Sequence, residues 1–351
     1  MSRNKQIDTF LTKCGWGKAT RNPVSGDASA RRYTRLDLNG ECAVLMDAPY
    51  TPQDDDPMSY NTRAKIAGLN PNAFICLASA LIRRGFSAPK IFGANLKQGL
   101  LLLEDFGDTL FATVLEKNPN LESKIYSEAI SVLASIYRSS ISSDLAAYST
   151  HWHVGNYDKV ALQTEVDLFF DWYLPEFDMG LKSTAKQEWA DLWQDSFQSL
   201  NAHAPGLALR DYHAENVFWL PKREGPARIG LIDFQDALFA HPAYDLVSLL
   251  EDARRDVSRS IVPMLISQFC REAGIEEDEK FHAAYAVSAA QRNAKILGLF
   301  VRLARRDKKR HYLDFIPRVA AHFRRDLSAP ALADLKKWTQ IHTSSLWSDN
   351  A

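Results

Sequence analysis

The sequence has few cysteines, and it lacks both a long apolar run and an excess of either charge. Its four cysteines are far apart and form no Cys-x-x-Cys pair, which argues against a zinc site or a disulfide framework and suits a reducing compartment. No stretch approaches the roughly 18 apolar residues of a membrane helix. The polar N-terminus lacks the apolar core of a signal peptide. We therefore expect a cytoplasmic protein with no membrane partner.

The charges nearly cancel, because 42 Lys and Arg residues stand against 43 Asp and Glu residues in 351. A balanced chain has no overall field to attract nucleic acid or an anionic membrane, so any phosphate binding must be local. At roughly 100–200 residues per domain, the length allows two lobes with separate cores. The composition therefore indicates a chain that folds without disulfides or a structural metal and gives no overall sign of a nucleic-acid or membrane partner.

The first hundred residues have the patterns of a small sheet. Two strand-like runs flank Asn39-Gly40, which predicts a hairpin because both residues tolerate positive φ. Apolar spacing predicts a helix that Gly85 ends, followed by two strands of which the second is interior. The expected elements are a helix at 7–14, the hairpin strands at 32–38 and 42–47, a helix at 71–84, and strands at 90–94 and 100–104.

Beyond residue 105 the spacing of apolar residues becomes helical, with a break where acidic loops occur. We expect helices at about 121–136, 162–173 (closed by Pro175), 183–202 and 243–252, and then helices continuing past 340 with breaks at Gly274 and Pro317. Two short strands should interrupt them. The predicted class is α+β, with a sheet-rich lobe at 1–104 and a mostly helical lobe at 105–351.

Three residues in the interrupting segment suit phosphoryl transfer. Asp211 and Asn216 have the Asp-to-Asn spacing of a kinase catalytic loop, and Asp233 follows an apolar run that reads as a buried strand. Asp211 is placed to accept the proton of a substrate hydroxyl. Asn216 and Asp233 offer the hard oxygens that Mg²⁺ prefers. His213 lies within the loop, and we expect it to shape the loop by local hydrogen bonds.

These motifs carry a resemblance to a known family. The segments Leu209–Asn216, Ile232–Asp236 and Pro242–Leu246 resemble the aminoglycoside phosphotransferase and choline kinase family of small-molecule kinases. Within it, the chain is most similar to bacterial anomeric kinases that phosphorylate N-acetylmuramate and N-acetylglucosamine at C1 during cell-wall recycling. The resemblance implies a two-lobed, protein-kinase-like fold, with ATP and Mg²⁺ as cofactors and an amino sugar as substrate.

The resemblance also implies two nucleotide-binding segments. Backbone N–H groups of the first would cover the phosphates, with an arginine adding charge, and the second would be a hinge whose backbone pairs with adenine. The phosphate loop comprises Ser25, Gly26, Asp27, Ala28 and Ser29, with Arg31 or Arg32. The hinge comprises Glu104, Asp105 and Phe106. Asp245 is expected to brace the catalytic loop.

One departure from the kinase pattern concerns the usual lysine of the third strand and its glutamate partner. Met46 and Cys76 stand near those positions, and neither can hold the α- and β-phosphates. Either an arginine of the first loop supplies the charge, or the chain is a weak or inactive kinase.

The acceptor site is expected in the helical lobe. Glu165 and Trp172 share a helix face and suit a sugar platform, although Trp172 could equally be core. Gln235 and Asp236 adjoin the metal aspartate and complete the expected site. The basic run 302–310 fits a solvated helix end, an anion site for a substrate carboxylate, or an RNA contact. An aminoglycoside, choline or another alcohol as acceptor, and a pseudokinase that binds a partner protein, remain alternatives.

Overall fold

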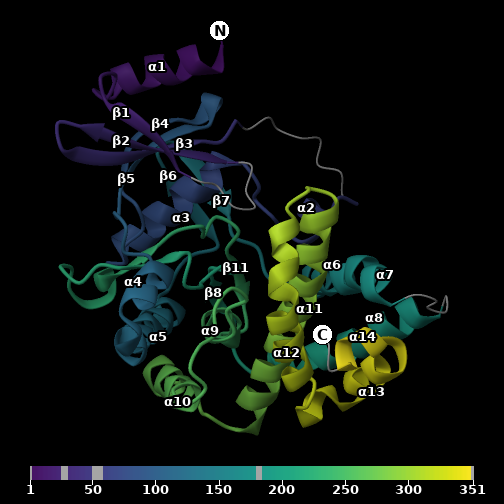
Figure 1. Ribbon diagram of the computed structural model, residues 1–351. Helices are drawn as coiled ribbons and strands as arrows, with labels where there is room; N and C mark the ends of the chain where they lie inside the picture. Colours follow the sequence, from purple (N-terminus) through teal and green to yellow (C-terminus); the bar gives the residue numbers. More distant parts are fainter. Residues whose placement is uncertain (1, 25–30, 50–57, 179–183, 349–351) are drawn as a thin grey trace.

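The computed structural model describes residues 2–24, 31–49, 58–178 and 184–348, and it contains a small sheet above a larger helical part (Figure 1). The strands are β1 Thr20–Val24, β2 Arg32–Leu38, β3 Glu41–Asp47, β4 Ile91–Asn95, β5 Leu100–Glu104, β6 Asp144–Ala147, β7 Thr150–His153, β8 Gly206–Ala208, β9 Val217–Trp219, β10 Ile229–Leu231 and β11 Leu238–Ala240. The helices are α1 Arg3–Lys13, α2 Tyr60–Arg63, α3 Pro71–Arg83, α4 Phe111–Lys117, α5 Glu122–Arg138, α6 Lys159–Leu168, α7 Leu174–Phe177, α8 Ala185–Ser196, α9 Ala243–Leu250, α10 Val262–Ala273, α11 Glu279–Arg305, α12 Ile316–Asp326, α13 Ala333–His342 and α14 Ser344–Trp347.

The main sheet is antiparallel, in the order β1-β2-β3-β5-β4. β5 is interior, as its unbroken apolar run predicts. Its alternate side chains enter two cores, because successive residues of a strand point to opposite faces. Leu100 and Leu102 pack with Phe10 and Leu11 of α1, whereas Leu101 and Leu103 pack with the α3 side.

The predicted hairpin and the helix that follows it are confirmed. Asn39 and Gly40 have φ angles of 55° and 88°, the left-handed values that a tight hairpin turn needs. Helix α3 ends at Arg83, and Gly85 follows with φ of 84°. β1 was not predicted, because its five residues are all exposed and Pro23 interrupts them, so that no alternation appears in the sequence.

The helical part is built around α11, which contacts α6, α9 and α12 (Figure 1). The helix predicted near 162–173 does not end at Pro175. It passes through a π-helical turn, Phe169–Tyr173, into α7. Pro175 is the second residue of α7, directly after the π-helical turn, and the helical path continues past it to Phe177, so reading it as a terminator was wrong.

The hairpin of β6 and β7 is a further element that the sequence did not predict. It packs on α3, although its residues lie beyond the expected lobe boundary at 104. Its turn uses Tyr148 and Ser149 at positive φ, which is uncommon for these residue types and gives no Asn-Gly signal.

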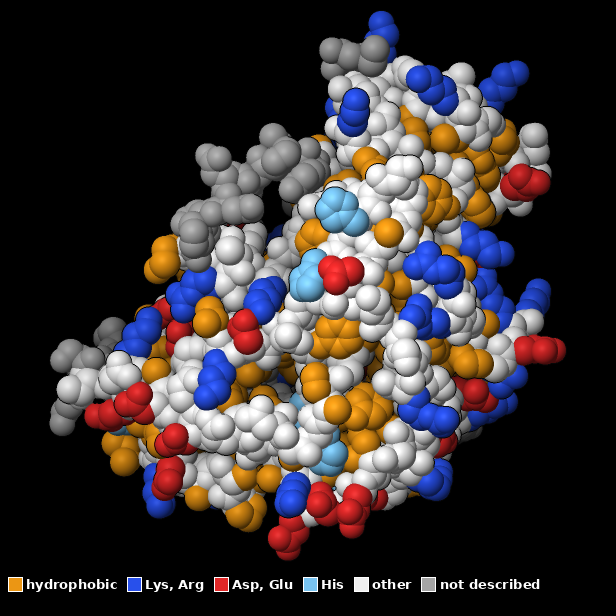
Figure 2. All heavy atoms as spheres, turned by 180° about the vertical axis from the view of Figure 1, so that it is seen from behind, with side chains coloured by type: hydrophobic (Ala, Val, Ile, Leu, Met, Phe, Trp, Pro, Cys, Tyr) orange, Lys and Arg blue, Asp and Glu red, His pale blue; other side chains and the backbone are white. Residues whose placement is uncertain are grey.

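Charged side chains are spread over the surface. Figure 2 shows Lys, Arg, Asp and Glu interspersed on one face without a large area of one sign, in keeping with the balanced composition. Within the described part of the chain, no helix is both long and apolar enough to cross a bilayer.

Candidate active site

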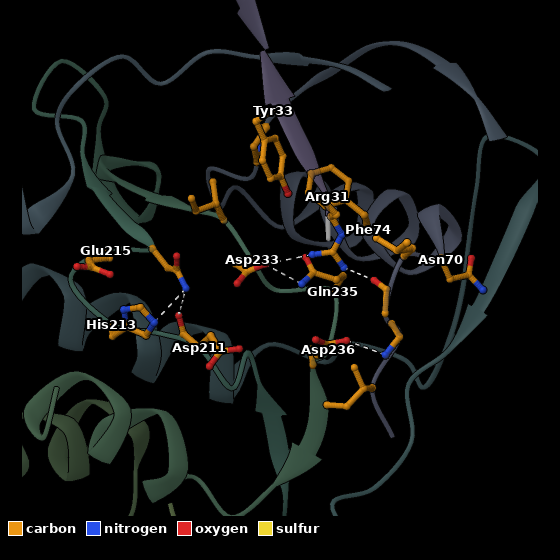
Figure 3. Close-up of a pocket in the computed structure, with 18 of the residues that line it drawn as sticks. Arg31, Tyr33, Asn70, Phe74, Asp211, His213, Glu215, Asp233, Gln235 and Asp236 are labelled. Atoms are coloured by element: carbon orange, nitrogen blue, oxygen red, sulfur yellow. Dashed lines mark hydrogen bonds and ion pairs between the residues drawn. The ribbon is translucent and has the colours of Figure 1, made fainter. Parts of the chain in front are cut away.

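Two loops that carry the predicted catalytic residues lie side by side because of how four short strands pair. β8 pairs with β11, and β9 pairs with β10, each antiparallel. The loop 209–216 runs from β8 to β9, and the loop 232–237 runs from β10 to β11. Both loops therefore bridge the same two ribbons, which brings Asp211 and Asp233 to one cavity of about 2210 Å³ (Figure 3).

The catalytic loop orients Asn216 and leaves one of its atoms available. Its Nδ2 donates to the backbone oxygen of Asp211 at 3.0 Å and to Nε2 of His213 at 3.2 Å. Both amide hydrogens are thus used, so Oδ1 is the atom that remains for a cation. Burial lowers the pKa of His213 to about 4, which leaves the ring neutral at pH 7 and able to accept at Nε2. His213 therefore shapes the loop through Asn216.

The Asp211 carboxyl group is surrounded by positively charged side chains. Burial opposes its ionisation, but the charges of Lys295, Arg292 and Arg210, among others, outweigh burial and hold the pKa of Asp211 below its ordinary value. The carboxylate is consequently ionised at neutral pH. That state is the one required to orient a hydroxyl and accept its proton.

Each of the two loops contains a residue with a strained backbone, and buried charges hold the catalytic loop in place. Arg210 and Asp233 have φ of 73° and 58°, in the left-handed region that such residues rarely adopt. Asp245 accepts hydrogen bonds from the backbone N–H groups of Leu209 and Arg210, as expected for a brace. The Arg210 side chain forms an ion pair with Glu165, and both are almost fully buried. Several contacts therefore fix the direction in which Asp211 points.

Asp233 meets an arginine in place of the usual lysine. Its Oδ1 accepts hydrogen bonds from Gln235 at 2.8 Å and from Arg31 at 3.3 Å (Figure 3). Burial and the charge of Asp211 raise the pKa of Asp233 to about 6, and Arg31 opposes that shift. Met46 is buried in the core and cannot supply this charge.

The donor set around Asp233 fits Mg²⁺. Two carboxylates that repel each other favour a cation near them, and Asn216 offers a neutral oxygen at the same cavity. Among the described residues no group of three or more His, Cys, Asp or Glu side chains gathers to hold a metal ion alone. The arrangement matches an ion held by a few protein oxygens together with substrate phosphates.

The expected hinge is part of the same cavity. Glu104, Asp105 and Phe106 all line it. Glu104 pairs with Arg223 at 2.6 Å, and Asp105 pairs with Arg35 at 2.6 Å, so their side chains are tied down. Apolar side chains that would suit a flat base line the cavity as well: they include Val44, Phe74, Leu103, Phe218 and Ile232.

The expected phosphate loop lies only partly within view. Ser25, Gly26, Asp27, Ala28 and Ser29 fall outside the described residues. The structure does distinguish the two arginines after the loop, because Arg31 is buried and lines the cavity whereas Arg32 is exposed and does not. Arg31 immediately precedes β2 and Arg32 is its first residue, and successive residues of an extended chain point to opposite sides.

The residues expected to bind the acceptor divide into two groups. Gln235 and Asp236 line the cavity, and Asp236 accepts a hydrogen bond from the backbone of Ala67 at 2.7 Å. Glu165 is fully buried between Arg210 and Lys295 and does not line the cavity. Trp172 packs against the core of the helical part. The sugar platform assigned to Glu165 and Trp172 is therefore corrected: side-chain packing, rather than solvent, occupies that helix face.

Sequence reasoning missed Arg292 and Lys295 of the long helix α11, and it named Arg302 only as part of the basic run 302–310. All three line the cavity, where Arg302 stacks on Tyr60 of α2 and the charges of Arg292 and Lys295 act on Asp211. Their spacing of three and seven residues could have suggested one helix face. Only the fold reveals that this face looks onto the cavity.

Comparisons with known proteins agree with this geometry. A family model described as "Phosphotransferase enzyme family" matches residues 20–285. A protein of Caulobacter vibrioides named N-acetylmuramate/N-acetylglucosamine kinase is 38% identical over 341 residues, which cover 94% of this chain and 93% of the relative. A protein of the same name from Pseudomonas putida is 28% identical over 344 residues, 95% of this chain and 92% of the relative.

Solved structures of similar fold are aminoglycoside phosphotransferases. The GDP complex of wild-type aminoglycoside 2'-phosphotransferase-IIIa matches with a TM-score of 0.56 at 12% identity, over 93% of this chain and 98% of that one. A spectinomycin phosphotransferase in complex with ADP and spectinomycin matches with a TM-score of 0.54 at 12% identity, over 96% and 98%. These matches confirm the predicted α+β, two-lobed, protein-kinase-like fold.

Proposed function

This chain belongs to the phosphotransferase enzyme family and is a small-molecule kinase, and from that premise we propose that it phosphorylates N-acetylmuramate and N-acetylglucosamine at C1 with ATP. The choice of acceptor is supported by the 38% identity to a protein named N-acetylmuramate/N-acetylglucosamine kinase, over nearly the whole of both chains. The observation that carries the chemistry is the meeting of Asp211, Asn216 and Asp233 at one cavity.

The reaction follows from the placement of Asp211. The C1 oxygen of the sugar attacks the γ-phosphorus of ATP, the bond from that phosphorus to the β–γ bridging oxygen breaks, and ADP leaves. The hydroxyl proton passes to the Asp211 carboxylate, which is ionised before the reaction begins. Arg31 contributes positive charge beside Asp233, where the phosphates would lie.

Asn216 and Asp233 would hold Mg²⁺, which when bound neutralises charge on the phosphates. The carboxylate and amide oxygens supply the protein ligands, and the nucleotide supplies the rest. The hinge Glu104–Phe106 and the apolar wall beside it would hold the adenine. We also propose that residues 1–104 and 105–351 act as the two lobes around the nucleotide.

The acceptor is tested by measuring ADP release with a panel of N-acetylmuramate, N-acetylglucosamine, choline, homoserine and kanamycin, and by locating the new phosphate with phosphorus NMR. We expect turnover with the two amino sugars and an anomeric phosphate as the product. Turnover with kanamycin or choline alone would move the acceptor to another alcohol. Nucleotide binding without turnover on any acceptor would favour a pseudokinase.

The role of Asp211 is tested by Asp211→Asn. The amide cannot accept the hydroxyl proton, so we expect kcat to fall by at least about 10²-fold while the affinity for ATP stays nearly unchanged. Steady-state kinetics and calorimetric titration with ATP measure the two quantities. Asp191→Asn on the surface of α8 is the matched control and should change neither. Normal turnover in Asp211→Asn would end the assignment.

A further inference from the structure

The long helix α11 presents positive side chains to the acceptor side of the cavity. Arg292, Lys295 and Arg302 all line it, and positions three, seven and ten residues apart fall near one face of a helix. Arg292 is 4% exposed and lies close enough to Asp211 for its charge to lower the pKa of that carboxyl. Lys295 pairs with Glu165 at 2.9 Å. Arg302 lies two turns beyond Lys295, about 10 Å along the axis.

Most positive side chains of the cavity already have a carboxylate partner. The pairs are Arg31 with Asp233, Arg35 with Asp105, Lys65 with Asp158, Arg254 with Glu215, and Lys295 with Glu165. Within the described ranges, Arg292 and Arg302 are the cavity cations without an ion pair. The charge of Arg292 acts on Asp211 and helps to keep that carboxylate ionised. Arg302 is therefore the cation available for a charge carried by the acceptor.

Arg302 is held by stacking, which leaves its hydrogen-bonding edge usable. Its guanidinium carbon lies 4.3 Å from the ring centroid of Tyr60, and both residues line the cavity. A guanidinium stacked on a ring keeps its in-plane N–H groups free to donate. Its Nε is buried and has no hydrogen-bond partner among the residues that the structure describes, and the Tyr60 side chain also hydrogen-bonds with the Arg302 side chain.

The other arginines at this helix end behave differently. Arg305 pairs with Glu176 away from the cavity, and Arg306 pairs with Asp307 at 2.7 Å. Neither lines the cavity. The basic run 302–310 is therefore divided: its later members fit the ordinary solvated helix end, and Arg302 alone turns to the cavity.

We propose that Arg302 binds the carboxylate of N-acetylmuramate, which is the group that distinguishes this sugar from N-acetylglucosamine. This inference rests on the proposed function. Six covalent bonds separate the C1 oxygen from the carboxylate carbon, which corresponds to roughly 6–7 Å. The charge of Lys295 acts on Asp211, and Arg302 lies two helical turns beyond Lys295. The length of the ligand and the reach of an arginine side chain together are enough to cover that distance.

The stacking of Arg302 on Tyr60 is compatible with a site that accepts both sugars. An arginine that faced a buried carboxylate of the protein would have to break that pair to bind the ligand. Arg302 instead rests on Tyr60, and the stack persists whether a carboxylate is present or absent. With N-acetylglucosamine bound, Arg302 keeps its stack on Tyr60, whereas N-acetylmuramate gains a charge-assisted hydrogen bond in addition.

The test compares kcat/KM for N-acetylmuramate, its neutral carboxamide analogue and N-acetylglucosamine in the wild type, Arg302→Met and Arg302→Lys. We expect the ratio of kcat/KM for N-acetylmuramate to that for N-acetylglucosamine to fall at least about 10-fold in Arg302→Met, and by less in Arg302→Lys, which keeps the charge without the planar fork. Arg305→Met removes an arginine three residues away and should keep the wild-type ratio.

The outcomes separate the inference from the function. A wild type that phosphorylates both sugars but whose Arg302→Met variant keeps their ratio would overturn the role of Arg302 and leave the function standing. Equal kcat/KM for N-acetylmuramate and its carboxamide in the wild type would overturn it without any variant. A wild type that phosphorylates neither sugar would overturn the proposed function itself.

Discussion

At the scale of single residues, the site depends on charged groups that never reach the cavity. Glu165 is fully buried and pairs with both Arg210 and Lys295. Arg210 belongs to the catalytic loop, and Lys295 belongs to α11, whose cavity face carries Arg302. Glu165 therefore connects the base loop with the proposed acceptor wall. Removing it would leave two buried positive charges without their partner, which is a costly change in a protein interior.

Met46 gives a prediction at the same scale. Met46 is 1% exposed and belongs to the buried hydrophobic cluster that also contains Cys76, so Met46→Lys would place a charge among apolar side chains. We expect the free energy of unfolding to fall by about 3–5 kcal/mol and kcat/KM for ATP not to rise, because Arg31 already supplies the charge at Asp233.

Denaturant unfolding and steady-state kinetics measure these two effects. Met46→Leu is the matched control and should cost less than about 1.5 kcal/mol, since it keeps an apolar side chain of similar volume. A stable Met46→Lys variant with higher affinity for ATP would mean that the usual kinase geometry can be restored.

At the scale of elements, α11 and α6 approach so closely that one position admits only glycine. A Cβ atom on Gly298 would lie 2.0 Å from the backbone oxygen of Leu168 and 2.5 Å from the nitrogen of Phe169. These atoms mark the junction of α6 with the π-helical turn, and the two helices together carry Glu165 and Lys295. The close crossing thus sets the distance between the halves of that ion pair.

Gly298→Ala should lower the free energy of unfolding, although helix propensity alone would predict that it rises. In an open helix the change stabilises by about 1 kcal/mol. Here the added methyl would meet backbone that cannot rotate away, so we expect destabilisation by about 3 kcal/mol or more. Thermal and urea unfolding would give the value. Stabilisation would show that the crossing has room that the structure does not indicate.

Some helices and strands could be predicted from the sequence and others could not. The hairpin about Asn39-Gly40 and helix α3 have strong local signals, and both were predicted. β1 and the β6–β7 hairpin have none, because β1 is exposed throughout and Tyr148-Ser149 is an unusual turn. The π-helical turn lies where α6 packs on α11, and no local pattern of residues predicts it.

At the scale of the whole molecule, binding of nucleotide should stabilise the fold. Residues that would hold ATP come from the sheet, the hinge and the catalytic loops, and the ligand would bridge them. At 100 times its dissociation constant, a ligand that binds only the folded state adds about 2.7 kcal/mol. We expect ATP with Mg²⁺ to raise Tm by several degrees in scanning calorimetry.

Removal of the metal tests the same prediction. Chelation of Mg²⁺ with EDTA should abolish most of the rise in Tm, and Asp233→Ala should abolish it even with Mg²⁺ present, because the main protein ligand is lost. Asp108→Ala, which removes an exposed carboxylate that also lines the cavity, is the control and should keep the rise. A normal rise in Asp233→Ala would place the metal elsewhere.

The sequence by itself determined the chemistry and most of the small sheet. Asp211, Asn216 and Asp233 could be proposed because the chemistry of phosphoryl transfer requires those oxygens, because Asp211 and Asn216 have the spacing of a kinase catalytic loop, and because Asp233 follows a short apolar run. Local rules of strand alternation and turn geometry likewise gave the hairpin and β5.

The tertiary structure decided which side chains face the cavity. Arg31 rather than Arg32 meets Asp233, Glu165 is fully buried, Trp172 is partly buried against the helical core, and Arg302 is separated from the basic run that follows it. The physical reason is that these outcomes depend on how α6, α11 and the loops pack across more than a hundred residues of sequence. Periodicity indicates that a helix has faces, and only packing determines what each face meets.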